Sequence, residues 1–358
     1  MPSSCKNTTK QDAKPLKASK DMEPWEKFWG PVFYQNQFKT TLEVPSKGSW
    51  PDVTGKCAIV TGSNSGLGLE SSKQLLSLGL SHLVMAVRSL ERGRAAAANL
   101  VEQNPTAKID VWKLDMESYD SIQAFVRKCQ QELTRIDFVI LNAGASPVRF
   151  AKVPATGHER TIQLNHISTA LLAVLLLPVL KSKTSGPDPP VLTAVSSVMA
   201  HLTSFTNRDQ RPLLPSFDDT SITSFSPPDR YGVSKLLCQL FFVRLAEKVD
   251  RNTVTINLVE PGLIKGTGLS REATGLAGVF SNIFHGIAGR PLEQGAATYL
   301  DAILRHGKES HGSYIMNFKF APLAKWYYSD GKALTDVIWT ETLQELSSVN
   351  LNDIIASL

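Results

Sequence analysis

Short apolar runs alternate along this chain with longer segments in which an apolar residue recurs every three or four positions. The short runs predict buried strands, and the longer segments predict helices. This alternation is typical of a parallel sheet with helices on both faces and ligands at the carboxyl ends of its strands. The predicted strands are 56–60, 82–87, 109–114, 138–141, 191–195, 253–259 and 313–318. Helices are predicted through Leu78 and over 90–103, 118–133, 169–180, 229–249, 293–304 and 332–346.

A glycine-rich turn, residues 61–68, separates the first predicted strand from the first helix. Its glycines would let the backbone approach a dinucleotide pyrophosphate, and the helix N-terminus would supply N–H groups and a positive dipole end. The alternative is a loop that merely contains glycines, but the strand and helix beside it favour the dinucleotide site. The predicted contacts are Gly62, Ser63, Asn64, Ser65, Gly66, Leu67 and Gly68.

The second predicted strand ends at Arg88, about twenty residues beyond the glycine turn. An acidic residue there would hold the ribose 2′-hydroxyl of NAD, whereas a cation would receive the 2′-phosphate of NADP. Arg88, with Arg92 and Arg94 on the following helix, therefore predicts NADP. The alternative is a solvated basic helix start, and it describes Arg94.

Further candidate cofactor contacts stand at the carboxyl ends of the next two strands. Asp115 and Met116 follow the third strand, and Asn142, Ala143 and Gly144 follow the fourth. We expect Asp115 to accept a hydrogen bond from the adenine amino group. The alternative for Asp115 is a carboxylate in a surface turn.

Tyr231 and Lys235 are four residues apart at the start of the helix predicted after Pro227-Pro228, with Asp229 as its N-cap. This spacing places both side chains on one helix face. A free phenol has a pKa of about 10, and a nearby ammonium lowers it by favouring the phenolate. The pair would then exchange a proton with an alcohol or a carbonyl. The alternative is an ordinary exposed helix pair.

Together these motifs resemble the short-chain dehydrogenase/reductase family. The resemblance covers about residues 54–304 and looks closest to the retinol dehydrogenase and protochlorophyllide reductase branch. It implies a single Rossmann-type, doubly wound domain with a seven-stranded parallel sheet. The motifs are Thr61-Gly62-x-x-x-Gly66-x-Gly68, Asn142-Ala143-Gly144, Asn165, Ser196-Ser197, Tyr231-x-x-x-Lys235 and Pro261-Gly262.

The resemblance implies that Asn165, Ser197, Tyr231 and Lys235 are catalytic and that no metal is required. Tyr231 would give its proton to a carbonyl oxygen as hydride arrives from the nicotinamide, and take it back in the oxidative direction. Lys235 would lower the tyrosine pKa and bond the nicotinamide ribose. Ser197, with Ser196 as the alternative, would hold the substrate oxygen. Asn165 would support the water chain that returns the proton through Lys235, unless it is only a helix kink or cap.

By the same resemblance, the loop after the sixth strand covers the nicotinamide with Pro261, Gly262, Ile264 and Thr267. One residue more than usual separates Gly262 from Thr267, which is a departure from the family pattern.

The domain is predicted over 55–320, with an extension over 1–54 and a tail helix over 321–358. We expect disorder as far as Lys20, because this segment has almost no large apolar residues. The aromatic-rich stretch 23–38 is expected to pack on the domain as a strap, with peripheral membrane contact as the alternative. Apolar residues at helical spacing within 270–291 predict either an apolar lid over the site or a core helix.

The amino-acid composition and net charge limit the partners and the cellular compartment that we expect for the protein. A net charge of +5 on 358 residues is mild and does not indicate nucleic acid. The four scattered cysteines and the polar start predict a reduced, cytoplasmic compartment without a secretory signal. The apolar run 169–180 is shorter than the roughly 20 residues of a membrane span. It and residues 236–245 are expected to pair across a homodimer or to pack on the sheet of a monomer.

These observations predict an NADP-dependent oxidoreductase that interconverts a carbonyl and an alcohol on a lipophilic small molecule, as a tailoring step in specialised metabolism. One alternative is reduction of a conjugated carbon–carbon double bond. Another is an inactive NADP-binding protein that docks a partner through residues 23–38.

Overall fold

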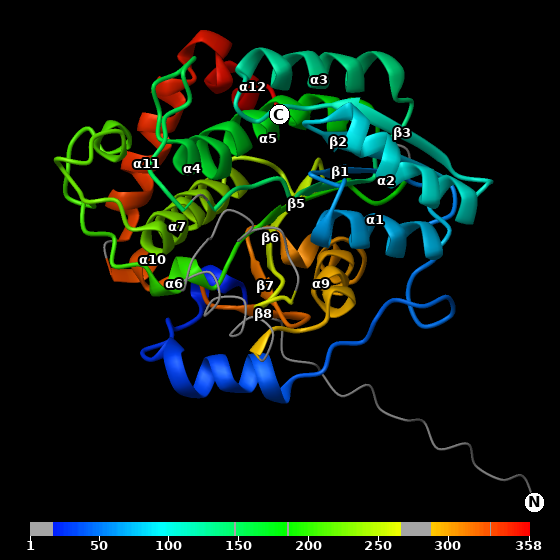
Figure 1. Ribbon diagram of the computed structural model, residues 1–358, viewed down its shortest axis with the longest axis horizontal. Coiled ribbons are helices and arrows are strands. Elements are labelled where there is room, and N and C mark those ends of the chain that lie inside the picture. The colour runs from blue at the N-terminus through cyan, green and yellow to red at the C-terminus, as the bar shows by residue number, and fades with distance from the viewer. Residues whose placement is uncertain (1–16, 147, 185, 266–287, 330) are drawn as a thin grey trace, which may run out of the picture.

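The computed structural model describes residues 17–146, 148–184, 186–265, 288–329 and 331–358. Its sheet has the strand order β3-β2-β1-β4-β5-β6-β7-β8 (Figure 1). Adjacent strands from β3 to β7 are parallel, and β8 pairs with β7 in the antiparallel sense. The strands are β1 (Cys57–Thr61), β2 (His82–Val87), β3 (Lys108–Lys113), β4 (Phe138–Leu141), β5 (Val191–Val195), β6 (Thr255–Glu260), β7 (Tyr314–Met316) and β8 (Lys319–Ala321).

The predicted doubly wound architecture is confirmed, with one more strand than the seven expected. The strand predicted over 313–318 ends at Met316, because Asn317 and Phe318 adopt left-handed backbone angles, with φ of 52° and 65°. These two residues reverse the chain, so that Lys319–Ala321 runs back along β7 as a short edge strand. The strand order reverses between β1 and β4, where a doubly wound sheet opens a crevice for a ligand.

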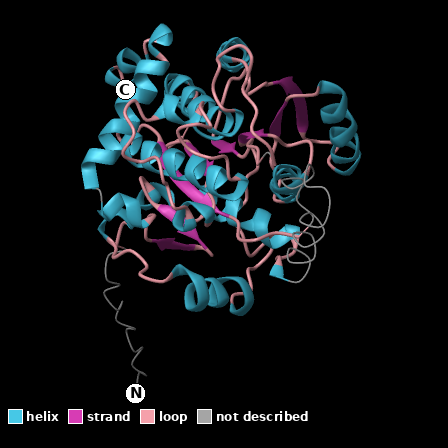
Figure 2. Cartoon of the chain, turned by 60° about the vertical axis from the view of Figure 1, so that its left-hand side comes forward, coloured by secondary structure: helices cyan, strands magenta, loops and turns pink. Residues whose placement is uncertain are grey.

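Helices cover both faces of the sheet (Figure 2). Successive strand residues point to opposite faces, so Cys57 and Ile59 of β1 join one core, and Ala58 and Val60 join the other. The first core lies under α3, α5 and α7, and the second lies under α1, α2 and α9. Their bounds are α1 (Gly66–Ser77), α2 (Leu90–Gln103), α3 (Tyr119–Glu132), α5 (Ser168–Ser182), α7 (Pro227–Ala246) and α9 (Leu292–Leu304).

The helix that continues from α4 (Arg160–Ile162) through η4 (Gln163–Ile167) into α5 is long and apolar enough to cross a membrane. However, 89% of its most apolar window is buried inside the protein. The apolar faces of α5 and α7 both belong to the core beside the sheet. These two helices therefore pack on the sheet, which was one of the two arrangements expected for them.

Helix α7 begins two residues earlier than the sequence indicated. Pro227 and Pro228 occupy its first turn and Ser226 is the N-cap, so the prediction of Asp229 as N-cap is wrong. Proline suits the first helical turn because its fixed φ is helical and it has no N–H to satisfy. The Asp229 carboxylate instead accepts hydrogen bonds from Thr203 Oγ1 at 2.8 Å and the Ser204 N–H at 2.8 Å.

The N-terminal extension forms η1 (Ser19–Asp21), η2 (Phe28–Val32) and η3 (Gln35–Lys39) and contacts β7 through Ser19 and Asn36. The prediction that the chain is disordered as far as Lys20 is wrong for Ser19, which is fully buried. Its hydroxyl accepts from the Tyr314 N–H at 2.8 Å and donates to the Tyr314 carbonyl at 3.2 Å. Hydrogen bonds to the backbone at the start of a strand can order a small polar residue that buries no apolar area.

Aromatic residues of the extension pack on the domain. The Phe28 ring stacks on half-buried His201 with centroids 5.4 Å apart, and the Trp25 ring lies 5.2 Å from the same imidazole. Tyr34 and Phe38 remain 52% and 48% exposed.

The C-terminal residues wrap around the α7 side of the domain. Trp339 of α11 (Gly331–Glu345) stacks on Phe241 of α7 with ring centroids 5.1 Å apart. The helix predicted over 332–346 is α11, and α12 (Leu351–Ala356) follows it and contacts α5. The other short helices in the described part of the chain are α6 (Met199–Leu202), η5 (Leu214–Phe217), η7 (Gly307–Ser310), α10 (Lys325–Ser329) and η8 (Ser347–Val349).

Candidate active site at the carboxyl ends of the strands

The glycine turn has the shape that a pyrophosphate needs. Gly62 and Gly66 adopt left-handed angles, with φ of 66° and 58°. A Cβ placed on Gly68 would lie 2.6 Å from Asn142 Nδ2 and 2.7 Å from the Gly62 carbonyl oxygen, so only glycine allows this approach. The buried Ser63 Oγ has no hydrogen-bond partner. No side chain caps the N-terminus of α1 at Ser65. The turn and this helix end therefore fit a phosphate group.

Asn142, at the end of β4, ties this strand to the glycine turn. Its Nδ2 donates to the Thr61 carbonyl at 2.8 Å, and its Oδ1 accepts from the buried Tyr299 hydroxyl at 3.1 Å. The Ala143 N–H donates to Thr61 Oγ1 at 2.8 Å. Asn142 and Ala143 therefore lie beside the glycine turn.

Lys235 reaches from α7 to the ends of the two central strands. Its Nζ donates to the Val195 carbonyl at 2.8 Å and lies 5.9 Å from the Tyr231 ring centroid. A Cβ placed on Gly144 would lie 3.5 Å from the same Nζ and 2.9 Å from Asn165 Oδ1. The structure thus brings Gly144, Asn165, Tyr231 and Lys235 together.

Asn165 lies in the π-helical turn η4, where its side chain joins three segments. Its Nδ2 donates to the Ala145 carbonyl at 2.8 Å and to Ser234 Oγ at 2.9 Å, and its Oδ1 accepts from the Ala145 N–H at 2.8 Å. The π-helical turn at Asn165 fits the structural alternative. The catalytic role of Asn165 stays a prediction.

The two serines after β5 differ in their surroundings. Ser196 is buried and its Oγ has no partner, whereas Ser197 is half-buried and its Oγ accepts from the Met199 N–H at 3.2 Å. The Ser197 hydroxyl also interacts with the Tyr231 phenol. Ser197 is therefore the serine that shares a surface with the tyrosine.

Burial raises the pKa of Tyr231 to about 12, although the interaction with Ser197 lowers it. The expectation that Lys235 makes this phenol acidic is wrong for this arrangement. The ammonium is directed to the Val195 carbonyl, and burial lowers the pKa of Lys235 itself. Desolvation of the phenolate outweighs the attraction of a cation placed at this distance.

The residues predicted for the adenosine end lie at the ends of β2 and β3. Arg88 is half-exposed, and its Nη1 lies 3.0 Å from Glu117 Oε1. Lys113 Nζ donates to the Arg88 carbonyl at 2.7 Å. Asp115 accepts from the Glu117 N–H at 3.2 Å, so its carboxylate also orders a turn. The Met116 carbonyl accepts from Ser168 Oγ at 2.6 Å.

The loop after β6 lies beside the glycine turn. Ile264 is buried, and a Cβ placed on Gly295 of α9 would lie 2.4 Å from Ile264 Cδ1 and 2.9 Å from Leu67 Cδ2. Ile264 and Leu67 therefore both pack against Gly295. Pro261 is also buried. Thr267 and most of the segment 270–291 predicted as a lid lie outside the described residues.

Sequence reasoning missed a buried carboxylate at this loop. Glu260 is 2% exposed, and its Oε1 accepts from the Gly262 N–H at 2.7 Å. Burial raises its pKa, opposed by the charge of Arg290, which is itself buried. The sequence signal was an acidic residue directly after the apolar pair Leu258-Val259.

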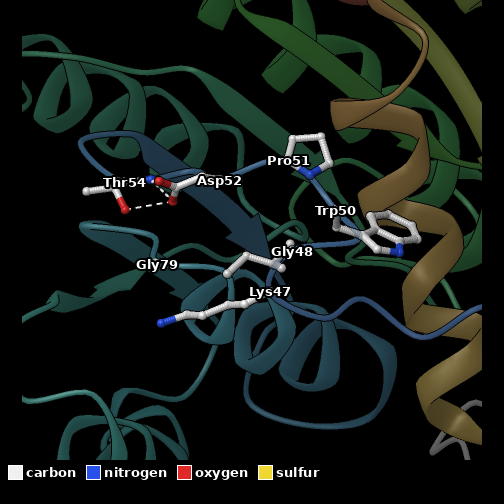
Figure 3. A pocket seen from close by; sticks show the side chains of 8 residues that line it. Lys47, Gly48, Trp50, Pro51, Asp52, Thr54 and Gly79 are labelled. Carbon is white, nitrogen blue, oxygen red and sulfur yellow. Dashed lines mark hydrogen bonds between the residues drawn. The ribbon is translucent and has the colours of Figure 1, made fainter.

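A surface pocket of about 300 Å³ lies at the opposite end of the sheet, where β1 and β2 begin (Figure 3). Its lining includes Lys47, Trp50, Asp52 and Gly79. Asp52 accepts from the Thr54 N–H at 3.0 Å and from Thr54 Oγ1 at 2.7 Å, which closes a turn. None of the predicted catalytic residues lines this pocket, so we assign no chemistry to it.

Comparison with known proteins identifies the family of this chain. A family model described as short chain dehydrogenase matches residues 56–206. The chain is 44% identical over 343 residues to the short chain dehydrogenase/reductase mfmJ of Annulohypoxylon moriforme, covering 95% of this chain and 98% of the relative. It is 43% identical over 309 residues to the short chain dehydrogenase virL of Hypocrea virens, covering 86% and 89%.

Solved structures share the fold. The Pseudomonas aeruginosa RhlG/NADP active-site complex has a TM-score of 0.56 at 21% identity, covering 74% of this chain and 95% of that one. The L-sorbose reductase of Gluconobacter frateurii, complexed with NADPH and L-sorbose, has a TM-score of 0.54 at 19% identity, covering 73% and 94%. The narrower resemblance to the retinol dehydrogenase branch stays a prediction. With a relative 44% identical along nearly its whole length, this chain belongs to the short-chain dehydrogenase/reductase family.

Proposed function

We propose that this oxidoreductase uses NADP to interconvert a carbonyl and an alcohol on a lipophilic small molecule. The observation that carries the proposal is the convergence of Tyr231, Lys235, Ser197 and Asn165 beside the glycine turn. A bound nicotinamide supplies the hydride in this chemistry. The protein must then orient the substrate and move a proton.

Ser197 and Tyr231 present two hydroxyl groups to one small region, where both can donate to a single substrate oxygen. Donors aimed at this oxygen stabilise the negative charge that develops on it during reduction. A phenol with a pKa of about 12 stays protonated at neutral pH. Tyr231 is therefore in the form that reduction needs, with its proton ready for the carbonyl oxygen. In the oxidative direction a phenolate must form first, so raised pH favours that direction.

Lys235 and Asn165 serve the return of the proton in this proposal. Lys235 Nζ donates to the Val195 carbonyl and lies close to Gly144, while Asn165 holds the backbone of Ala145 on both its N–H and its carbonyl. Asn165 thus fixes the loop after β4 next to the ammonium. Asn165 would support a water chain beside this loop, and a proton lost from Tyr231 would be replaced from solvent through that chain and Lys235.

The preference for NADP rests on the charges at the ends of β2 and β3. Arg88 and Lys113 lie together there, and Arg88 pairs with Glu117 through a half-exposed ion pair. An exposed pair of this kind contributes little energy, so a 2′-phosphate can draw the guanidinium away from Glu117. The solved relatives that contain NADP or NADPH, RhlG and L-sorbose reductase, fit the same preference.

The substrate class rests on the sequence, in which residues 276–287 carry Leu276, Val279, Phe280, Ile283, Phe284 and Ile287 at helical spacing. A lipophilic carbonyl compound suits a stretch of this apolar composition. We place the reaction in the cytoplasm, as a tailoring step of specialised metabolism carried out by a monomer or a homodimer.

A screen of apolar carbonyl compounds with NADPH and with NADH tests the proposal, with nucleotide oxidation followed by absorbance and products identified by mass spectrometry. We expect alcohols as products, and faster turnover with NADPH. A product saturated at a conjugated double bond with its carbonyl intact would support the double-bond reductase instead. NADPH binding without turnover of any compound would support a binding protein.

A further inference from the structure

A glutamine of the N-terminal extension makes hydrogen bonds to the backbone of the loop that follows β6. Gln37 is 9% exposed, although its neighbours Gln35 and Phe38 are exposed. Its Nε2 donates to the Leu263 carbonyl at 2.8 Å, and its Oε1 accepts from the Leu263 N–H at 3.1 Å. The same Nε2 donates to the Ala288 carbonyl at 2.8 Å. The Gln37 side chain thus uses both N–H donors and its carbonyl acceptor in hydrogen bonds to the backbone of Leu263 and Ala288.

Arg290 also makes hydrogen bonds to the backbone of this loop. Its backbone N–H donates to the Leu263 carbonyl at 2.7 Å, and its carbonyl accepts from the Lys265 N–H at 3.0 Å. A Cβ placed on Gly262 would lie 3.1 Å from Arg290 Cζ, so the guanidinium lies against the backbone there. Arg290 Nη2 donates to the Asn36 carbonyl. The loop is therefore hydrogen-bonded both to Gln37 of the extension and to the backbone of Arg290.

The position of this loop bears on the glycine turn, because both pack against Gly295 of α9. Ile264 follows Leu263 directly, and its buried side chain lies against Gly295, as does the side chain of Leu67. Leu67 belongs to the turn expected to hold the pyrophosphate, whereas Ile264 belongs to the loop expected to cover the nicotinamide. A displacement of Leu263 would change the spacing between the two parts of the cofactor site.

We propose that Gln37 is a positioning residue for residues 261–264, which makes the N-terminal extension a part of the nicotinamide site. This inference rests on the proposed function. Gln37 touches neither the substrate nor the reacting atoms, and it acts through the Leu263 backbone. Three hydrogen bonds from one buried amide hold the loop in register, as a neighbouring strand would.

Binding of NADPH and of adenosine 2′,5′-bisphosphate to the full chain separates this role from general folding. The bisphosphate carries only the adenosine half and does not reach the loop. Gln37→Met keeps the buried volume but leaves the Leu263 and Ala288 carbonyls without these donors. We expect its Kd for NADPH to rise at least about tenfold, with the Kd for the bisphosphate unchanged within about twofold. Gln35→Met, at an exposed glutamine in the same helical turn, should bind both ligands like the parent protein.

Gln37→Glu gives an independent readout, because a carboxylate keeps an acceptor for the Leu263 N–H but faces two carbonyl oxygens without a proton to donate. It should weaken NADPH binding as Gln37→Met does. Unchanged NADPH affinity in both variants would overturn the proposal. Equal loss of both ligands in both variants would also overturn it, since the extension would then support the whole domain. A parent protein that binds neither ligand would contradict the proposed function itself.

Discussion

A histidine between two carboxylates ties the end of α11 to the domain. His158 Nδ1 lies 2.9 Å from Asp218 Oδ2, and its Nε2 lies 3.0 Å from Glu345 Oε1. Ionised carboxylates only accept hydrogen bonds, so both ring nitrogens carry a proton. These two hydrogen bonds raise the pKa of His158 to about 9. We predict that His158→Gln removes a pH-dependent part of the free energy of unfolding.

The size of this part follows from the difference between the folded and unfolded pKa values. An unfolded histidine titrates near pH 6.5, and each pKa unit is worth about 1.4 kcal/mol. A folded pKa of about 9 therefore corresponds to about 3 kcal/mol. Because the folded pKa is the raised one, the contribution is complete below about pH 6.5 and is lost as the pH rises to about 9. The His158 side chain is only 9% exposed, so solvent screens it little.

Urea unfolding of the parent protein and of His158→Gln at about pH 6 and about pH 9.5 measures this contribution. The parent should be more stable by about 3 kcal/mol at the lower pH, and most of this gap should close at the higher pH. A gap that stays the same at both values would refute the reasoning. NMR titration of the His158 ring provides a direct check, since a pKa near 6.5 would show that the carboxylates do not hold the charge.

Two further predictions concern the cofactor and the substrate oxygen. Arg88→Asp should weaken NADPH binding at least about tenfold more than NADH binding in calorimetric titrations, because the 2′-phosphate would meet a carboxylate. An equal loss of affinity for NADPH and NADH would show that Arg88 does not bind the 2′-phosphate. Ser197→Ala should lower kcat for carbonyl reduction by about 100-fold with the Kd for NADPH unchanged, because one donor to the developing oxyanion is lost. An unchanged kcat in stopped-flow assays would show that Ser197 does not hold the substrate oxygen.

The sheet and its helices were predictable because their signals are local. The apolar run of β1 and the glycines after it specify a strand, a turn and a helix within about twenty residues. Asn142 was also predictable beside the glycine turn, since parallel strands place their carboxyl ends on one edge of the sheet. The family resemblance, rather than topology, added Lys235 to the same predicted site.

Features that depend on burial and on distant contacts were not predictable. The Tyr231–Lys235 spacing indicated an acidic phenol, but the degree of burial sets its pKa, and burial depends on the assembled fold. The contacts of Gln37 with Leu263 span 226 positions along the chain and leave no periodic pattern. Ser19 is ordered in the same way, by a partner on β7. A polar residue that pairs with a remote backbone has no signature of its own in a single sequence.

Transfer of deuterium from the nicotinamide of deuterated NADPH to the carbonyl carbon of a reduced substrate tests the role of Tyr231 most directly. The parent protein and Tyr34→Phe, which alters an exposed tyrosine outside the site, should both transfer the label. Tyr231→Phe should transfer it at least about 100-fold more slowly while binding NADPH with unchanged affinity. Equal transfer by Tyr231→Phe and the parent would contradict the assignment of Tyr231 as the proton donor.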